Sequence, residues 1–383
     1  MRIGIIGAGH AGIEAAKAAS EQGADVVLFS AEKVLPYYRP RLVALAFGQA
    51  ELTAIQIKPQ AWYDQLKISL RLDARVLCLD SEKCEIKTSA GTDTFDGLVI
   101  ACGGIPVMPS FSESCGPLMT PLWNVTHATA IRERIRKNAR LVVVGGGILG
   151  IEAALHAIEA DMSVVIIEKM NRLMPAQFGA TASCALLRRL EEKGIRVLLA
   201  RGVSSANEDS GILKLQIEGG ESLEADLCLM SIGARPDLTL AVSGDVSCER
   251  GIVVDQYLQT PVRSLAAAGD VIQFEGVTRC SMKEASTQGR LAALNLVARL
   301  RGQDELAYVP ETIPLTFRSK DFEIYSIGET AAPGSEERLL DGSTESLIRA
   351  LVIKDGIPVG VQMIGTRDGF DAYATQVKKA QKK

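Results

Sequence analysis

Short apolar runs alternate with longer Ala-rich stretches along most of the chain. The runs Arg2–Ile6 and Leu141–Val144 each predict a buried strand, and each leads through a Gly-rich turn into a stretch with helical spacing of apolar residues. Runs of the same kind predict further strands at Ala24–Phe29, Gly97–Ala101, Ser163–Glu168 and Leu227–Ile232. Strands that alternate with helices indicate an α/β protein with parallel sheets.

Two stretches interrupt this pattern with an alternation of polar and apolar residues, at about Arg75–Phe95 and Ile212–Leu223, and predict β-meander inserts. After Pro236 the chain gives a run at Leu265–Asp270 and a helix over about Met282–Leu300, which we expect to complete the first domain. The last part alternates as strands do and ends in a basic helix. Its expected strands are Ile313–Phe317, Phe322–Ile327, Leu347–Ile353 and Val359–Ile364.

The predicted fold class is therefore α/β. We expect two Rossmann-like domains of three layers (ββα), each with a β-meander insert, and a small α+β domain at the C-terminus. The expected limits are 1–108 together with 237–308 for a discontinuous first domain, 109–236 for the second and 309–383 for the third.

Two Gly-rich turns carry the strongest chemical signal. Gly7–Gly12 and Gly145–Gly150 each have the G-x-G-x-x-G pattern after a strand and before a helix, which is the context that a dinucleotide fingerprint needs. The first glycine allows the tight turn, the second lets the backbone approach a pyrophosphate, and the third lets the helix pack on the strand. The amides of the helix N-terminus then face the phosphates. Two bound dinucleotides imply electron transfer between them, and Ala266–Asp270 adds a flavin-type signature.

Composition narrows the class of protein. The chain of 383 residues is 47% hydrophobic, which is enough for two or three domains with their own cores. A net charge of −4 gives no basic footprint for nucleic acid. No apolar run approaches the roughly 20 residues that span a membrane. Met1 leads directly into the first strand without a signal peptide, so we expect a cytoplasmic protein.

The eight cysteines are scattered, without a Cys-x-x-Cys pair or a neighbouring histidine. This pattern argues against a metal site, an iron–sulfur cluster and a secreted disulfide scaffold. We expect most of these cysteines to be small buried hydrophobic residues.

The order and spacing of several motifs over nearly the whole chain resemble the FAD-dependent pyridine nucleotide-disulfide oxidoreductases. Within that superfamily the chain is most similar to the rubredoxin reductase and nitrite reductase flavoprotein branch, chiefly through the sequence Pro36–Leu42. The motifs that carry the resemblance are Gly7–Gly12, Leu35–Leu42, Val99–Pro106, Gly145–Glu152, Arg172–Pro175, Ser231–Pro236 and Leu265–Asp270.

The resemblance implies that the first domain binds FAD. Gly7, Gly9 and Gly12 would hold the pyrophosphate, and Asp270 would accept hydrogen bonds from the ribityl hydroxyls. The helix that begins near Lys283 and Glu284 would direct its amides at the flavin N1 and C2 carbonyl. The other residues expected at FAD are Arg39 and Pro40 near the isoalloxazine, with Ala101, Gly103 and Gly269.

The residues expected at the adenosine ribose of FAD depart from the pattern that is common in the family. The strand that ends at Phe29 is followed by Ser30, where relatives commonly have an acid, and Glu32 comes two residues later. Ser30 or Glu32 could serve, and an ordinary loop acid is the alternative for Glu32.

The second domain would bind the pyridine nucleotide through Gly145, Gly147 and Gly150, with Gly233 nearby. Its second strand ends in Glu168, 23 positions after Gly145, where a carboxylate accepts hydrogen bonds from the ribose of NAD and repels a 2′-phosphate. NADH is therefore the expected donor. The basic residues Lys169 and Arg172 follow closely, so use of NADPH stays an alternative.

Glu152 is the expected catalytic residue. It lies just inside the helix that follows the second Gly-rich turn, where relatives place a glutamate beside the nicotinamide. The alternative is an acid in the first helical turn that the helix dipole favours.

The absence of cysteine from one segment separates this chain from the disulfide reductases of the superfamily. Disulfide reductases of the superfamily carry redox cysteines on the helix after the first flavin strand, whereas the corresponding segment Arg41–Gly48 has none. Electrons that reach the flavin must then leave directly from it. We expect an FAD-dependent NADH oxidoreductase, without a redox-active disulfide, that passes electrons to a small carrier protein such as rubredoxin. Arg39, Arg41, Arg318 and Lys320 are candidate docking residues.

Two alternatives stay open. One is an NADH oxidase or a nitrite-reductase-type flavoprotein component, which would use a small-molecule acceptor. The other belongs to a different class, a non-catalytic redox sensor that binds FAD or NAD. The sequence also leaves open whether the protein is a homo-oligomer.

Overall fold

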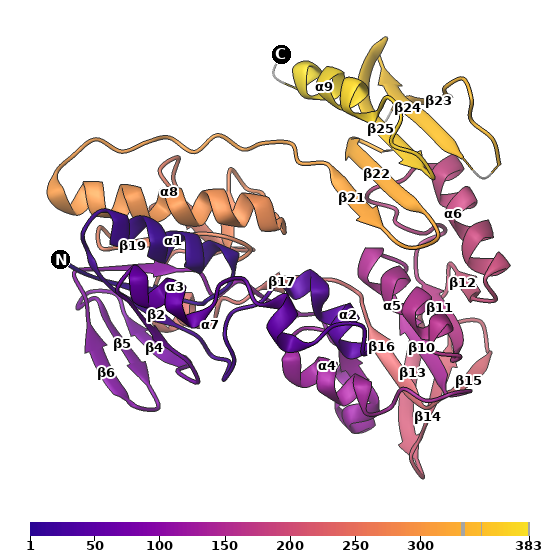
Figure 1. Cartoon of the computed structure of the whole chain (residues 1–383), viewed down its shortest axis with the longest axis horizontal. Coiled ribbons are helices and arrows are strands. Elements are labelled where there is room, and N and C mark those ends of the chain that lie inside the picture. Colours follow the sequence, from indigo (N-terminus) through magenta and orange to yellow (C-terminus); the bar gives the residue numbers. More distant parts are fainter. Residues whose placement is uncertain (331–333, 346, 382–383) are drawn as a thin grey trace. The chain divides into compact units, whose positions relative to one another are not determined.

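A computed structural model describes residues 1–330, 334–345 and 347–381. The chain divides into two units, and it passes between them several times (Figure 1). Unit 1 comprises Met1–Tyr38, Leu52–Ile105 and Ala234–Glu311. Unit 2 comprises Arg39–Glu51, Pro106–Gly233 and Thr312–Lys383.

Unit 1 is built on a five-stranded parallel sheet in the order β19-β7-β1-β2-β3. Its strands are β19 (Leu265–Ala267), β7 (Gly97–Ile100), β1 (Arg2–Ile6), β2 (Asp25–Phe29) and β3 (Ile68–Arg71). The central strands are apolar and buried, as expected for strands covered on both faces. After β1 the chain continues to β2 and β3 on one side and returns to β7 on the other. This reversal of direction creates a crevice at the carboxyl ends of the strands, beside β1.

Helices α1 (His10–Glu21) and α8 (Met282–Arg301) form one layer of unit 1, and the meander β4 (Val76–Asp80), β5 (Glu85–Thr88) and β6 (Gly91–Thr94) forms another. Figure 1 shows the two helices side by side on one side of the parallel sheet and the meander on the other. The helices approach closely because small residues face one another: a Cβ at Gly289 of α8 would lie 1.9 Å from the carbonyl oxygen of Ala11.

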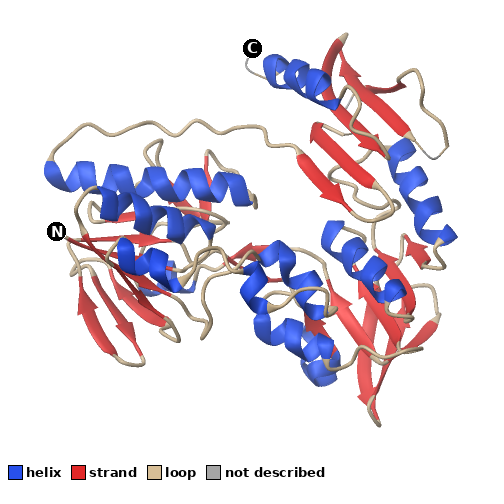
Figure 2. Cartoon of the chain, in the orientation of Figure 1, coloured by secondary structure: helices blue, strands red, loops and turns tan. Residues whose placement is uncertain are grey.

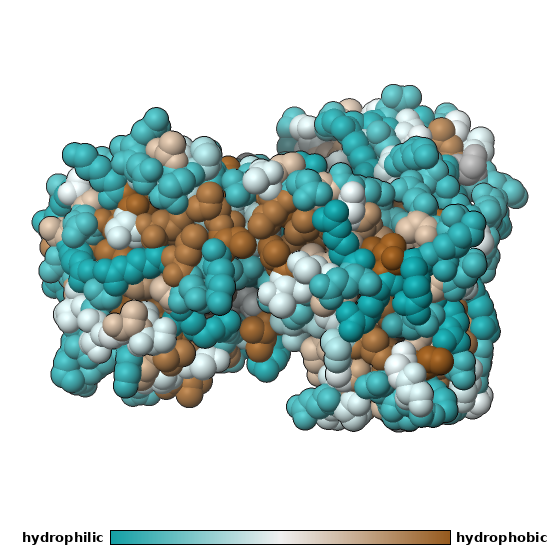
Figure 3. Space-filling view, turned by 60° about the horizontal axis from the view of Figure 1, so that its bottom comes forward, coloured by the Kyte–Doolittle hydropathy of each residue, from teal (hydrophilic) through white to brown (hydrophobic). Residues whose placement is uncertain are grey.

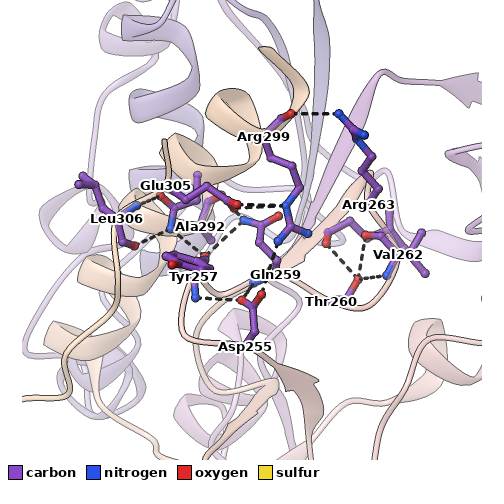
Figure 4. A network of polar contacts seen from close by, with 12 residues as sticks. Asp255, Tyr257, Gln259, Thr260, Val262, Arg263, Ala292, Arg299, Glu305 and Leu306 are labelled. Carbon is purple, nitrogen blue, oxygen red and sulfur yellow. Dashed lines mark hydrogen bonds and ion pairs between the residues drawn. The ribbon is translucent and has the colours of Figure 1, made fainter. Parts of the chain in front are cut away.

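A polar network fixes the far half of α8 (Figure 4). The side-chain amide of Asn295 donates to the carbonyl oxygens of Tyr257 and Leu306, and its oxygen accepts from the Leu306 amide, each at 2.8 Å. Arg299, one turn later, pairs with Asp255 and Glu305. The network ties α8 to the loop before β19 and to the segment after the helix.

Unit 2 repeats the plan with the parallel sheet β12-β11-β10-β16-β9. Its strands are β12 (Arg196–Leu199), β11 (Ser163–Glu168), β10 (Arg140–Val144), β16 (Leu227–Met230) and β9 (Met119–Pro121). The insert is a three-stranded antiparallel sheet of β13 (Val203–Asp209), β14 (Ile212–Ile217) and β15 (Ser222–Ala225). The helices are α2 (Leu42–Ala46), α4 (Val125–Arg132), α5 (Ile148–Glu159) and α6 (Ala180–Glu192), and α2 packs against α4 and α5.

The last part of unit 2 is an antiparallel sheet in the order β21-β22-β25-β24-β23, with helix α9 (Phe370–Ala380) on one face (Figure 2). Its strands are β21 (Leu315–Arg318), β22 (Glu323–Gly328), β23 (Glu336–Leu339), β24 (Ile348–Lys354) and β25 (Ile357–Ile364). Alternate residues such as Tyr325, Val361 and Met363 pack with Phe370 of α9 in one cluster. The opposite face meets α6, which packs against β24 and β25.

The remaining elements are short. They are the strands β8 (Gly104–Pro106), β17 (Ala234–Pro236), β18 (Ile252–Val254) and β20 (Ile272–Phe274), the helices α3 (Gln60–Gln65) and α7 (Thr239–Ser243), and the 3-10 helices Arg39–Arg41, Leu52–Ile55 and Ser110–Leu118. Hydrophilic and hydrophobic residues are mixed on the face of the molecule that Figure 3 draws. Within the described ranges, no helix has the length and the apolar character that crossing a membrane requires.

The structure confirms the predicted fold class, with Rossmann-like parallel sheets, meander inserts and an α+β end. The prediction did not include the edge strands β3, β9, β12 and β23. Of these, β23 is rich in charged residues, which are typical of edges that avoid further pairing. The predicted basic helix at the C-terminus is α9, and residues 382 and 383 lie outside the described residues. The predicted domain limits, and the ligand predicted for each domain, stay predictions.

Candidate dinucleotide and redox site

The first Gly-rich turn has the backbone that a dinucleotide turn needs. Gly7 adopts φ +107°, and a Cβ there would lie 2.3 Å from the Ala101 carbonyl oxygen. A Cβ at Gly12 would lie 1.7 Å from the carbonyl oxygen of Gly7, so the helix can approach the turn only with glycine at this position. Gly9, in contrast, has open space where a side chain would be, and it begins α1 without a side-chain cap. The first turn of α1 therefore has no side-chain cap, and a ligand could approach it at Gly9.

Several predicted FAD residues lie at the carboxyl ends of neighbouring strands. Ile6 pairs with Phe29 and with Ile100, and Ile100 pairs with Ala267, so the residues that follow these strands lie along one edge of the sheet. Those residues are Gly7, Ser30, Ala101 with Gly103, and Gly269 with Asp270. This is the edge at which open α/β sheets bind ligands.

The adenosine candidates lie together in the loop after β2. The Ser30 hydroxyl, which is buried, accepts a hydrogen bond from the Glu32 amide at 3.2 Å. The Tyr37 hydroxyl donates to the Glu32 carboxylate at 2.6 Å. Both candidates are therefore held in place by local contacts.

Helix α8 begins at Met282, beside the predicted FAD residues Lys283 and Glu284. Ser281 caps the helix by accepting from the Glu284 amide at 3.4 Å. Glu284 is buried and accepts from the Tyr308 hydroxyl at 3.1 Å, whereas Lys283 is exposed and pairs with Glu311. Glu284 thus anchors the first turn from within unit 1.

Arg39 and Pro40, which we predicted near the isoalloxazine, belong to the segment of the chain that clusters with unit 2. Both are exposed, and the Arg39 guanidinium lies 4.9 Å from the centre of the Trp123 ring. This cation–π contact holds Arg39 on unit 2.

The second Gly-rich turn repeats the first. Gly145 has φ +112°, with a Cβ position 2.1 Å from the Ser231 carbonyl oxygen, and a Cβ at Gly150 would lie 2.2 Å from the carbonyl oxygen of Gly145. Gly147 begins α5 without a side-chain cap and has open space at its Cβ position. Gly233 follows β16 and accepts a hydrogen bond from the Val107 amide at 3.0 Å.

Glu168 ends β11 beside this turn. One carboxylate oxygen accepts from the Gly146 amide and the other from the Met170 amide, each at 2.7 Å. Only 8% of the residue is exposed. Glu168 therefore holds the Gly-rich turn to the loop that follows β11, in addition to the role predicted for it at the ribose. Lys169 is exposed, and the Arg172 guanidinium donates to the Phe178 carbonyl oxygen at 3.3 Å.

Glu152 is the fifth residue of α5, past the first turn, which contains no acidic residue. The alternative explanation by the helix dipole is therefore wrong. Glu152 lines a cavity of about 300 Å³ within unit 2. Burial raises the pKa of its carboxyl from 4.5 to about 7. The other lining residues are Gln49, Leu155, His156, Glu159 and the segment Phe317–Asp321.

The cavity brings together three parts of unit 2 that are distant in sequence. Gln49 follows α2 and donates to Glu159 at 2.9 Å, and Phe47 stacks on His156 at 5.9 Å between ring centres. The exposed cations Arg318 and Lys320 come from the end of β21 and the turn after it. A raised pKa and convergent polar groups in one cavity are typical of a functional site.

No disulfide links the cysteines of the described residues, and no group of acidic, histidine and cysteine side chains among them could hold a metal ion. The Cys102 thiol donates to the Asp237 carbonyl oxygen at 3.5 Å. Burial raises the pKa of this thiol to about 12, so the reactive thiolate is not formed at neutral pH.

Both turns fit a dinucleotide. Each has glycines at the positions where a Cβ would collide with backbone and an open space before an uncapped helix N-terminus. Such an N-terminus offers unsatisfied amides and the positive end of the helix dipole to a pyrophosphate.

Some residues that were not predicted hold the loops of the site in place. The Gln288 side chain accepts from the Gly269 amide at 2.9 Å and donates to Tyr308, and so holds the turn before Asp270. In unit 2 the Met174 amide donates to the Gly146 carbonyl oxygen at 3.0 Å. The one signal in the sequence that could have indicated Gln288 is its position on the apolar face of the predicted helix, where a glutamine needs a hydrogen-bond partner.

Comparison with known proteins places these features in a family. The sequence profile described as pyridine nucleotide-disulphide oxidoreductase matches residues 1–290. A rubredoxin-NAD(+) reductase of Pseudomonas putida is 30% identical over 275 residues, which cover 70% of this chain and 71% of the relative. A nitrite reductase [NAD(P)H] of Bacillus subtilis is 24% identical over 380 residues, and the chain spans only 47% of its length.

Among solved structures, a covalent complex of putidaredoxin reductase with putidaredoxin has the same fold. The TM-score is 0.87 at 22% sequence identity, with 99% of this chain and 93% of that chain covered. The profile spans most of the chain and includes both Gly-rich turns. The chain therefore belongs to the pyridine nucleotide-disulphide oxidoreductase family, a family of oxidoreductases that use FAD and NAD(P)H.

Proposed function

We propose that this chain passes electrons from NADH, through FAD, to a small redox carrier protein such as rubredoxin. The observation that carries the proposal is the pair of matched Gly-rich turns, one in each unit, each with an open space before an uncapped helix. FAD, when bound, accepts a hydride from NADH and passes the electrons on.

Unit 1 supplies the FAD site in this proposal. Gly7, Gly9 and Gly12 would receive the pyrophosphate, and Asp270 would accept hydrogen bonds from the ribityl chain. The common edge of the strands β19, β7, β1 and β2 supports this assignment, because it brings these residues together. The other proposed contacts are Ser30 or Glu32, Arg39, Pro40, Ala101, Gly103, Gly269, Lys283 and Glu284.

Unit 2 supplies the NADH site. Gly145, Gly147 and Gly150 would receive its pyrophosphate, with Gly233 at the neighbouring strand end. The Glu168 carboxylate accepts two amide hydrogen bonds and retains lone pairs for the ribose hydroxyls. Its negative charge would repel the 2′-phosphate of NADPH, so NADH is the proposed donor.

The Glu152 carboxyl would contribute at the nicotinamide. A pKa near 7 lets it hold or release a proton at neutral pH, and it lines the cavity of unit 2. We assign it as the catalytic residue of the proposal because its acidity is matched to the working pH.

The proposed acceptor is a protein carrier. The segment Arg41–Gly48 contains no cysteine, so a thiol relay of the disulfide-reductase type is not available there. A relative that is 30% identical over 70% of this chain and 71% of its own length is a rubredoxin-NAD(+) reductase. Arg318 and Lys320 are exposed beside the cavity and would attract an acidic carrier.

Steady-state oxidation of NADH by the FAD-loaded protein tests the proposal. Under nitrogen, we expect fast turnover only when oxidised rubredoxin is added, with two rubredoxins reduced per NADH because each accepts one electron. The double variant Arg318→Gln and Lys320→Gln should raise the KM for rubredoxin and weaken the dependence on salt. Arg75→Gln with Lys87→Gln removes the same two positive charges from exposed positions of unit 1 and controls for the change in charge. Turnover in air alone would identify an oxidase, and slow turnover with every acceptor would favour a sensor.

A further inference from the structure

Two buried polar side chains of the C-terminal sheet point away from α9. Ser326 of β22 and Gln362 of β25 are direct cross-strand partners and are 2% and 0% exposed. Their sequence neighbours Tyr325, Val361 and Met363 pack in the cluster with α9, so the alternation of the strands places Ser326 and Gln362 on the opposite face. Buried polar groups require hydrogen-bond partners, and their partners show what this face holds.

Both side chains bind the backbone of the loop between β11 and α6. The Gly179 amide donates to the Gln362 side-chain oxygen at 2.7 Å, and this bond is fully buried. The Ser326 hydroxyl donates to the Gln177 carbonyl oxygen at 2.6 Å. A third contact follows at the start of α6, where the Glu337 carboxylate accepts from the Thr181 hydroxyl at 3.0 Å. The C-terminal sheet thus fixes the end of this loop.

The same loop holds the second Gly-rich turn at its other end. The Leu173 side chain is fully buried and fills the space beside Gly146, where an added Cβ would lie 2.5 Å from a Leu173 methyl group. The Met174 amide donates to the Gly146 carbonyl oxygen at 3.0 Å. Glu168 bridges the Gly146 and Met170 amides on the strand side. The loop is therefore clamped between Gly146 and the C-terminal sheet.

We propose that Ser326 and Gln362 are positioning residues for the pyridine nucleotide. They hold the loop Met170–Gly179 against Gly146, and the C-terminal sheet thereby sets the affinity of the second Gly-rich turn for NADH. The inference rests on the proposed function, which assigns the pyridine nucleotide to this turn. Neither residue touches the nucleotide in this account.

The physical reason is preorganisation. A loop that is already ordered loses less conformational entropy on binding, so the ligand binds more tightly. Without its acceptor, the buried Gly179 amide must find another partner, and the loop must shift to reach one. A shift of the loop would withdraw Leu173 from Gly146 and move the Met170 amide that orients Glu168.

Gln362→Leu and Ser326→Ala test this inference in the FAD-loaded full chain. Calorimetric titration measures binding of ADP-ribose, a probe that binds without transferring a hydride, and binding of NADH is measured under nitrogen on the protein whose FAD has first been reduced with dithionite. We expect the Kd of both probes to rise about tenfold in Gln362→Leu and several-fold in Ser326→Ala, within the usual range of coupling between sites. The KM for NADH should rise in parallel, while kcat at saturating NADH and the flavin spectrum stay unchanged.

Two matched variants separate positioning from general stability. Gln259→Leu makes the same exchange at a buried position of unit 1, where the side-chain amide donates to the carbonyl oxygens of Tyr257 and Ala292, and should leave the Kd unchanged. Ser343→Ala removes a hydroxyl of the same sheet region that bonds only within its own hairpin, to Arg349, and should leave the Kd unchanged.

Wild-type affinity in both Gln362→Leu and Ser326→Ala would overturn the inference and leave the proposed function intact. An equal loss of affinity in Gln259→Leu would also overturn it, because general destabilisation would then be the cause. If Gln362→Leu does not fold, Ser326→Ala alone decides. Failure of the wild-type protein to bind either NADH or ADP-ribose would overturn the proposed function itself, and this inference with it.

Discussion

Replacement of Glu152 by glutamine should stabilise the protein at alkaline pH and have no effect on stability in acid. The Glu152 carboxyl has a pKa of about 7 in the folded chain, against 4.5 when exposed, because burial disfavours its charged form. Below pH 4.5 the group is protonated in both the folded and the unfolded state and costs nothing. As the pH rises from 4.5 to about 7, the unfolded state ionises while the folded state keeps its proton, so stability falls over this interval and stays low above pH 7. Glutamine carries no charge at any pH.

The difference between the two pKa values of Glu152 gives the size of this effect on the free energy of unfolding. At about 1.4 kcal/mol per pKa unit, a rise from 4.5 to about 7 corresponds to an upper limit of roughly 3 kcal/mol. The side chain is half-buried, so water screens part of this energy, and we expect about 2 kcal/mol at pH 8. For a domain of this size, that difference corresponds to a rise of about 4–8 °C in Tm.

The assay is thermal unfolding of wild type and Glu152→Gln at pH 4.5 and pH 8, followed by circular dichroism. Glu192→Gln, on the exposed face of α6, removes the same charge from the surface and serves as the control. A stability gain of the same size at both pH values, or none at pH 8, would refute the reasoning, because the gain would then not come from a buried carboxylate. A stabilising substitution that also slows flavin reduction would be typical of a functional residue.

Three further predictions concern other parts of the chain. Gly12→Ala should unfold at a much lower temperature, because its Cβ would lie 1.7 Å from the Gly7 carbonyl oxygen. Gly9→Ala has open space at its Cβ position, so it should keep the stability of the apoprotein and weaken FAD binding. Equal melting temperatures of the two variants would contradict the steric argument. Asn295→Leu should lower the free energy of unfolding in urea by about 3 kcal/mol, since it leaves three backbone groups without their partner, and a loss below about 1 kcal/mol would show that water replaces it. Cys102 should resist iodoacetamide at pH 8 because its pKa is about 12, and mass spectrometry that finds it alkylated in the folded protein would contradict the burial.

Local sequence signals predicted the elements and turns that depend on neighbouring residues. The glycines at 7, 12, 145 and 150 are required by close backbone approaches, and such requirements leave a fixed spacing in the sequence. The apolar strands and the Ala-rich helices likewise follow from burial, which sets the periodicity of the chain. These signals were enough to predict the central strands of both parallel sheets, but not their edge strands β3, β9 and β12.

Contacts between distant parts of the chain could not be predicted in this way. Gln362 and Gly179 are 183 positions apart, and Pro358–Gly365 predicted only a strand. Periodicity indicates that a residue is buried, but it does not identify the partner of a buried amide. For the same reason the sequence did not show that Glu168 holds Gly146, or that the segment Arg39–Glu51 clusters with the second unit.

The central claim is that the two Gly-rich turns hold FAD and NADH and that a hydride passes from one to the other. The most direct test is a single-turnover measurement, in which the FAD-loaded protein is mixed with NADH under nitrogen and the visible absorbance of the flavin is followed. The account predicts rapid loss of the flavin absorbance with NADH, slower loss with NADPH, and full recovery when oxidised rubredoxin is added. A flavin that stays oxidised although NADH binds would contradict it.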